Sequence, residues 1–171
     1  MYQQEKLERP RRLAYRPREK CIIAVSYILL CITLVMIGSQ YPHVADTVPA
    51  HFNIHGEVDR WGDKREIFIL IGVYIISVIL PIILAHFPRC YNLPNHVNKE
   101  NMEDVLYACR FVVLIMSIYV HFIFIPILYA VMAMKNPTLS WFGLWGLMSS
   151  IFLVVWSIYY IYYRKIYYRK K

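Results

Sequence analysis

The sequence predicts an all-α integral membrane protein: a bundle of four transmembrane helices with a structured extracytoplasmic loop between the first two. Hydrophobic residues make up 58% of its 171 residues and charged residues only 18%. The apolar residues are concentrated in four blocks, each about as long as the helix of roughly 20 residues that spans a bilayer. Four such blocks in so short a chain would leave almost no polar surface to cover them in water, so a soluble domain is excluded. The expected spans are residues 21–38, 66–86, 105–134 and 141–161.

The distribution of basic residues predicts the orientation of these spans. The net charge of +8 is concentrated at the two ends, with seven Lys/Arg in residues 1–20 and five in residues 164–171. Because cytoplasmic segments of membrane proteins are enriched in Lys and Arg, we expect two cytoplasmic tails, at 1–20 and 164–171. They flank a membrane domain formed by residues 21–163. The same charge suits contact with anionic lipid headgroups, so a nucleic-acid partner is not expected.

The spans differ in the polar residues that they contain. The first carries no charge, and the second contains Pro81, which is expected to kink or interrupt the helix near its inner end. Arg110 lies near the start of the third span, where its side chain can reach the interface. The fourth span ends in a segment rich in Tyr, Lys and Arg, which is typical of an interfacial anchor. The four cysteines have no CxxC spacing, and a disulfide framework is not expected.

The loop between the first two spans, residues 39–65, is the only long stretch dense in Pro, Gly, Asp, His and Asn. The residues on either side of His55 and Gly56 read as two short extended arms about a turn, which predicts a short β-hairpin. Phe52 and Trp61 suit the headgroup region of a membrane. With both termini in the cytoplasm this loop faces outward, and it is the best candidate for a functional site.

Residues 48–64, VPAHFNIHGEVDRWGDK, contain the pattern P-x-HFN-x-x-G-x-x-D-x-WG-x-K. Together with the two flanking spans, this pattern resembles a family of bacterial membrane proteins that share a domain of unknown function. The same domain forms the first half of SdpI-type immunity proteins, which protect bacteria from a secreted peptide toxin. Residues 105–163 do not resemble the second half of those proteins. The resemblance implies a multi-pass protein of the bacterial cell membrane with a precedent in toxin immunity, and it implies no reaction. The positions that match the pattern are Pro49, His51, Phe52, Asn53, Gly56, Asp59, Trp61, Gly62 and Lys64.

Two interpretations of the polar residues in this pattern are open. In the first, His51, Asn53 and Asp59 hydrogen-bond the backbone of the turn and one another, and Asp59 and Lys64 pair or bond backbone groups. The alternative is a zinc site, for which the candidate ligands are His43, His51, His55, Glu57 and Asp59. The expected hairpin disfavours the helix on which an HxxxH spacing would bring two histidines together. We therefore expect the hydrogen-bonded arrangement and no cofactor.

His121 is the one ionisable group deep in an expected span, a position that by default suggests proton or ion passage. The alternative is a neutral imidazole that hydrogen-bonds a serine or a carbonyl group of a neighbouring helix. No other buried acid or base accompanies His121 in the expected spans, so a relay would lack partners. We expect the neutral, hydrogen-bonded imidazole.

The sequence favours a binding function over catalysis. It contains no Gly-x-Ser-x-Gly, HExxH or phosphate-binding loop and no paired catalytic carboxylates, so an enzyme is not expected. The expected function is binding of a peptide or protein partner at the outer loop, in toxin immunity or envelope signalling. The alternative is a small transporter, or a transporter accessory subunit, that uses His121.

Overall fold

The computed structural model describes residues 10–53, 55, 57–93, 97–133, 151, 153–154 and 156–158. Three long helices dominate it: α1 (Pro17–Gln40), α2 (Glu66–Leu84) and α3 (Met102–Ala133). Each is long and apolar enough to cross a membrane, so three of the four expected spans are helices of the required kind. Most of the fourth expected span, 141–161, lies outside the described residues.

The outer faces of these helices are apolar. Val35 of α1, Ile69 of α2 and Phe122 of α3 are 71%, 69% and 63% exposed. Side chains of this kind match the acyl chains of a bilayer, whereas so large an apolar surface is rare on a soluble monomer. The three helices therefore fit a multi-pass membrane protein.

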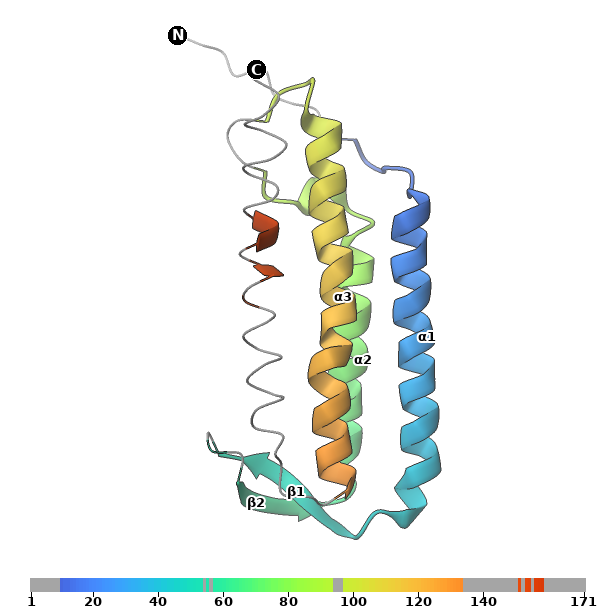
Figure 1. Cartoon of the computed structure of the whole chain (residues 1–171), viewed down its shortest axis with the longest axis vertical. Helices are drawn as coiled ribbons and strands as arrows, with labels where there is room; N and C mark the ends of the chain where they lie inside the picture. Colours follow the sequence, from blue (N-terminus) through green and yellow to red (C-terminus); the bar gives the residue numbers. More distant parts are fainter. Residues whose placement is uncertain are drawn as a thin grey trace.

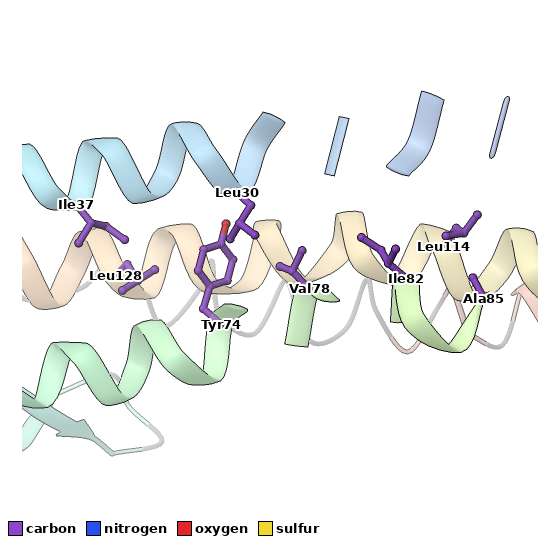
Figure 2. Packing of buried hydrophobic residues seen from close by; sticks show 8 residues of the cluster. All are labelled: Leu30, Ile37, Tyr74, Val78, Ile82, Ala85, Leu114 and Leu128. Carbon is purple, nitrogen blue, oxygen red and sulfur yellow. The ribbon is translucent and has the colours of Figure 1, made fainter. Parts of the chain in front are cut away.

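The interior of the bundle is centred on α3, which packs against both α1 and α2, while α1 and α2 contact each other less. In Figure 1, α1 lies beside α3, and α2 runs behind it. Figure 2 shows the side chains that meet between the three helices. They are Leu30 and Ile37 of α1, Tyr74, Val78, Ile82 and Ala85 of α2, and Leu114 and Leu128 of α3.

The buried face of α1 also carries polar residues. Glu19, Ser26 and Thr33 are buried and follow one another at intervals of seven residues, as do the buried Leu30 and Ile37. A repeat of seven keeps side chains on one face of a helix over several turns. Polar and apolar stripes of α1 therefore both face the interior, and the polar stripe must find partners there.

The loop between α1 and α2 forms the predicted β-hairpin. Strands β1 (Thr47–Phe52) and β2 (Val58–Asp63) make a two-stranded antiparallel sheet at one end of the bundle, the lower end in Figure 1. The pairing is irregular between Pro49 and His51, next to a proline that has no N–H to donate to a ladder. Gly56, at the predicted turn, lies outside the described residues.

A small apolar cluster fastens the hairpin to the helices. The Val48 side chain of β1 is fully buried among Val44, Ile67 of α2 and Val131 of α3. An isolated two-stranded hairpin is marginally stable in water. Contact with α2 and α3 therefore holds this one in place, and one face of β1 is committed to that contact.

The ends of the helices differ slightly from expectation. α2 runs through Pro81 to Leu84, so this proline does not end the helix where it occurs. α3 begins at Met102, three residues before the expected span, and its first N–H donates to the carbonyl group of Asn98 over 3.0 Å. All four cysteines are free thiols, as expected.

Candidate functional site

Asn53 organises the turn of the hairpin. Its side-chain oxygen accepts hydrogen bonds from the backbone N–H groups of His55 (2.9 Å) and Glu57 (3.0 Å). Its side-chain amide donates to the Glu57 carboxylate over 3.0 Å, and its backbone N–H donates to the Glu57 carbonyl group over 2.9 Å. A short Asn side chain is suited to this role because it bonds backbone groups two to four residues along the chain. The motif asparagine therefore shapes the turn.

His51 and Asp59 face each other across the two strands. The distance from His51 Nδ1 to Asp59 Oδ1 is 2.6 Å, and both side chains are largely exposed. Because Asp59 accepts a hydrogen from Nδ1, the Nε2 atom of a neutral His51 carries a lone pair. The pair fixes the orientation of the imidazole ring. Asp59 therefore pairs with His51, and the expectation that it could pair with Lys64 is wrong.

The remaining charges of the hairpin are paired locally. Lys64 Nζ lies 2.8 Å from Asp46 Oδ1 and Arg60 Nη2 lies 2.9 Å from Glu66 Oε2. The hydrogen bond to Asp46 raises the pKa of Lys64. Asp63 accepts hydrogen bonds from the side chain and backbone of Arg65, which lower the pKa of the Asp63 carboxyl group. Exposed ion pairs of this kind stabilise weakly, and their effect here is to leave little unbalanced charge on the hairpin.

Gly62 lies against α2. A Cβ at this position would overlap the Glu66 carboxylate and stand 2.9 Å from the Cβ of Ala50. The motif glycine is therefore required for close packing between β2 and the first turn of α2. The sequence pattern includes a glycine at position 62, but the reason for it is visible only in the packing of β2 against Glu66 and Ala50.

The other described motif residues differ in their burial. Pro49 is buried beside Val48, and Phe52 is half-buried. Trp61, in the middle of β2, is 52% exposed.

Within the residues that the structure covers, no three His, Cys, Asp or Glu side chains come together as a metal ion would require. The zinc alternative thus finds no assembled ligand set in that part of the chain.

His121 lies at the second place where polar residues gather. Its Nδ1 atom is 2.6 Å from the hydroxyl oxygen of Tyr74 on α2, and its Nε2 atom is 3.3 Å from the hydroxyl oxygen of Ser26 on α1. His121 is only 2% exposed, and Ser26 and Tyr74 are fully buried. The imidazole therefore joins all three helices, as the interpretation of a bonded, structural histidine expects.

The number of hydrogens fixes the direction of these hydrogen bonds. Ser117 donates its hydroxyl hydrogen to the Leu114 carbonyl group over 2.7 Å, and Ser26 donates to Ser117 over 2.9 Å. Ser26 then has no hydrogen left for His121, so Nε2–H donates to Ser26, and Nδ1 accepts from Tyr74. These hydrogen bonds form a hydrogen-bonded chain that runs in one direction, from Tyr74 through His121, Ser26 and Ser117 to the Leu114 carbonyl group. Both ring nitrogens of His121 are paired in it.

Several partners of the predicted residues were not visible in the sequence. Asp46 and Glu66 lie outside the motif yet bind Lys64 and Arg60. Tyr74 and Ser117 resemble any other polar residue in an apolar span. A signal existed for Ser26, because it belongs to the polar repeat of α1.

Comparisons with known proteins match the part of the chain that contains the hairpin. Residues 28–75 match a family model described as a domain of unknown function (DUF1648). That range runs from α1 through the hairpin into α2. The chain is also 28% identical over 83 residues to an uncharacterized protein of Archaeoglobus fulgidus, a match that covers 44% of this chain and 45% of the relative. The chain thus spans less than half the length of that relative. No solved structure matches it.

The close packing at Gly62 predicts that Gly62→Ala destabilises the protein. The added methyl group forces Glu66 away from Arg60 and crowds Ala50, and overpacking of this kind costs about 1–3 kcal/mol. The measurement is the free energy of unfolding in detergent. Gly72→Ala is the matched control, because nothing lies within 4 Å of a Cβ at Gly72. An equal loss of stability in the two variants would contradict the packing role of Gly62.

The hydrogen bond from Tyr74 to His121 predicts that Tyr74→Phe destabilises the protein. This change removes the hydrogen donated to His121 Nδ1 and keeps the ring. Hydrogen bonds between transmembrane helices stabilise by about 0.6–1.7 kcal/mol, and we expect a loss in that range when unfolding is followed in detergent. Tyr27→Phe is the control because Tyr27 is 42% exposed on α1. If both changes are neutral, the Tyr74 hydroxyl does not hold the helices together.

Proposed function

We propose that this protein is an integral membrane protein of the binding class, and that its hairpin recognises a peptide or protein partner outside the cytoplasm. Protection against a secreted peptide toxin is the activity that we favour, and envelope signalling is the wider class to which it would belong. The observation that carries the proposal is the exposed Trp61 on a hairpin whose charges are already paired.

The internal pairing supports recognition by shape. His51, Arg60 and Lys64 each have an acidic partner within the hairpin or at its base. A partner attracted by broad electrostatics would need unbalanced charge, and little is left. Fixed side chains also lose less freedom on binding, which favours affinity.

Trp61 supplies the apolar anchor for such a surface. Tryptophan is enriched among the residues that dominate binding energy at protein interfaces. Trp61 is half exposed and lies two residues from Asp59, so the imidazole–carboxylate pair is close to it in sequence. The same exposed indole would also suit the headgroup layer of the membrane. The test below separates these two roles.

The alternative of a transporter that uses His121 has less support. The hydrogen-bonded chain through His121 ends at the carbonyl group of Leu114 on the same helix as Ser117. Leu114 is fully buried. A proton or ion would have to displace a satisfied network and pass an apolar side chain. The polar chain accordingly favours a structural role for His121.

The proposal requires that the hairpin lie outside the cytoplasm. A cysteine at Glu57, in a background where the four native cysteines are replaced, should react with a membrane-impermeant maleimide in intact cells. A cysteine at Asn98, at the opposite end of the bundle, should react only after the cells are opened. The reverse pattern would place the hairpin in the cytoplasm and remove the basis of the proposal.

The binding role predicts that Trp61→Ala reduces protection more than it reduces stability. Cells that express the chain are challenged with a secreted peptide toxin, and we expect the variant to lower protection about tenfold or more, as loss of an interface tryptophan does. Its melting temperature in detergent should change little, because Trp61 is half exposed.

The control for this experiment is Phe122→Ala, which removes an exposed aromatic side chain from the outer face of α3. It should leave both protection and melting temperature unchanged. Absence of protection by the wild-type chain would refute toxin immunity. Equal protection by wild type and Trp61→Ala would show that the indole faces lipid and recognises no partner.

A further inference from the structure

A buried ionic cluster lies at the end of the bundle opposite the hairpin. The side chains of Arg110 on α3 and Glu19 on α1 are only 1% and 0% exposed. The central carbon of the Arg110 guanidinium lies 4.5 Å from the ring centroid of Tyr15. We call Tyr15, Glu19 and Arg110 the Arg110 cluster. Charges buried to this extent need several hydrogen-bond partners to be tolerated.

Residues 10–14, which we call the N-terminal strap, cover the Arg110 cluster. Arg110 Nη1 donates to the carbonyl groups of Leu13 (3.2 Å) and Ala14 (3.4 Å), and the Tyr107 hydroxyl group donates to Ala14 over 3.1 Å. The strap thus satisfies one of the three guanidinium nitrogens. Its carbonyl groups do not reach the other two.

Four atoms of the Arg110 cluster have no hydrogen-bond partner in the described part of the chain. They are Nε and Nη2 of Arg110, the hydroxyl oxygen of Tyr15 and Oε1 of Glu19. The ion pair does not relieve this, because Arg110 Nη1 and Glu19 Oε2 are 3.8 Å apart and Oε2 already accepts from the Arg16 N–H over 2.8 Å. Buried polar atoms in native proteins are normally paired with protein, water or ligand.

The unpaired atoms define the chemistry of a partner. Nε–H and Nη2–H lie on one edge of the guanidinium, which binds two oxygens of a phosphate or carboxylate side by side. Tyr15 adds a third donor, and burial raises the pKa of its hydroxyl group, which keeps it protonated. Glu19 Oε1 needs a donor, and its negative charge favours a cationic one. The complement is therefore an oxyanion joined to an ammonium group.

The depth of the cluster points to the source of such a ligand. α3 has 32 residues and is about 48 Å long, whereas the hydrocarbon core of a bilayer is roughly 30 Å thick. Arg110 lies eight residues beyond the first residue of α3, or about 12 Å along the axis. This position is close to the level at which lipid headgroups begin. Phosphate and ammonium groups occur together there in zwitterionic lipids.

We propose that the Arg110 cluster binds a phosphoethanolamine headgroup, with the phosphate on Arg110 and Tyr15 and the ammonium group on Glu19. Because Arg110 and Glu19 are closed to solvent, the headgroup enters when the N-terminal strap moves aside, while Tyr15 stays beside Arg110. The strap contacts Arg110 only through the Leu13 and Ala14 carbonyl groups at Nη1, so the free edge of Arg110 stays available to the phosphate. The pair of charges in the cluster balances the pair of charges in the headgroup.

The test compares lipids that differ in the headgroup alone. The full-length protein is purified in detergent and titrated by native mass spectrometry with phosphatidylethanolamine, phosphatidylglycerol and phosphatidylcholine of one chain composition. We expect one tightly bound phosphatidylethanolamine, favoured over phosphatidylcholine by about tenfold, since a quaternary ammonium has no N–H to donate to Glu19. Soluble phosphoethanolamine distinguishes the sources of the ligand. Its competition shows that the headgroup alone suffices, and its failure to compete with a selectively bound lipid shows that the acyl chains are required.

Tyr15→Phe is the most discriminating variant. The Tyr15 hydroxyl makes no hydrogen bond within the described part of the chain, so its removal should not lower the melting temperature without lipid, yet it should weaken the binding of phosphatidylethanolamine. Arg110→Lys keeps the charge, loses the paired donors and should reduce the headgroup preference about tenfold. Arg18→Lys, which alters an exposed arginine of α1, is the control and should bind as wild type does.

Two results would overturn the proposal. Equal binding of the three lipids by the wild-type protein would mean that the Arg110 cluster does not read headgroups. A full headgroup preference in both Tyr15→Phe and Arg110→Lys would mean that the lipid binds elsewhere.

Discussion

The hydrogen-bonded chain from Tyr74 through His121, Ser26 and Ser117 is the constraint on which the bundle depends. Apolar packing alone does not choose one arrangement of helices in lipid, because acyl chains are as apolar as leucine side chains. A polar group inside a membrane domain has few alternative partners, so one set of bonds fixes both the rotation and the height of each helix. α3 provides two members of the chain and α1 and α2 provide one each. The central position of α3 in the fold follows from this.

The fold could be predicted from the sequence where it depends on length and local pattern. Apolar blocks of bilayer length identified α1, α2 and α3, and the turn-forming residues about His55 identified the hairpin. The centrality of α3 could not be predicted, because hydrophobicity does not say which spans touch. The burial of Glu19 was also missed. A glutamate in a basic segment reads as a solvated residue, and only the return of α3 and the folding back of residues 10–16 enclose it.

In the candidate site, too, local bonds could be predicted from the sequence, whereas contacts with residues outside the motif could not. The sequence pattern identified Asn53 and His51, and their bonds are local enough to be expected from chemistry. For Lys64 the expected alternatives were Asp59 and backbone groups; its partner Asp46 was missed, because it precedes the strand and comes close only when the hairpin closes. The role of Gly62 depends on Glu66 in the next helix. For His121 the sequence supplied the chemistry of a bonded imidazole, and the structure supplied Tyr74 and Ser26 as its partners.

The spacing of these bonds along the chain has a consequence for the order of membrane insertion. The described side-chain bonds of the hairpin join residues close in sequence, such as His51 and Asp59 or Asn53 and Glu57. Contacts between near neighbours form fast, and the hairpin can therefore close before α3 is in place. The bonds from Ser26 to Ser117 and from Arg110 to Leu13 span 91 and 97 residues. They can form only when α3 leaves the ribosome and enters the bilayer. Until then, Ser26 and Tyr74 lack their partners on α3 and Glu19 lacks Arg110, so the nascent α1–α2 pair carries polar groups that only α3 can satisfy.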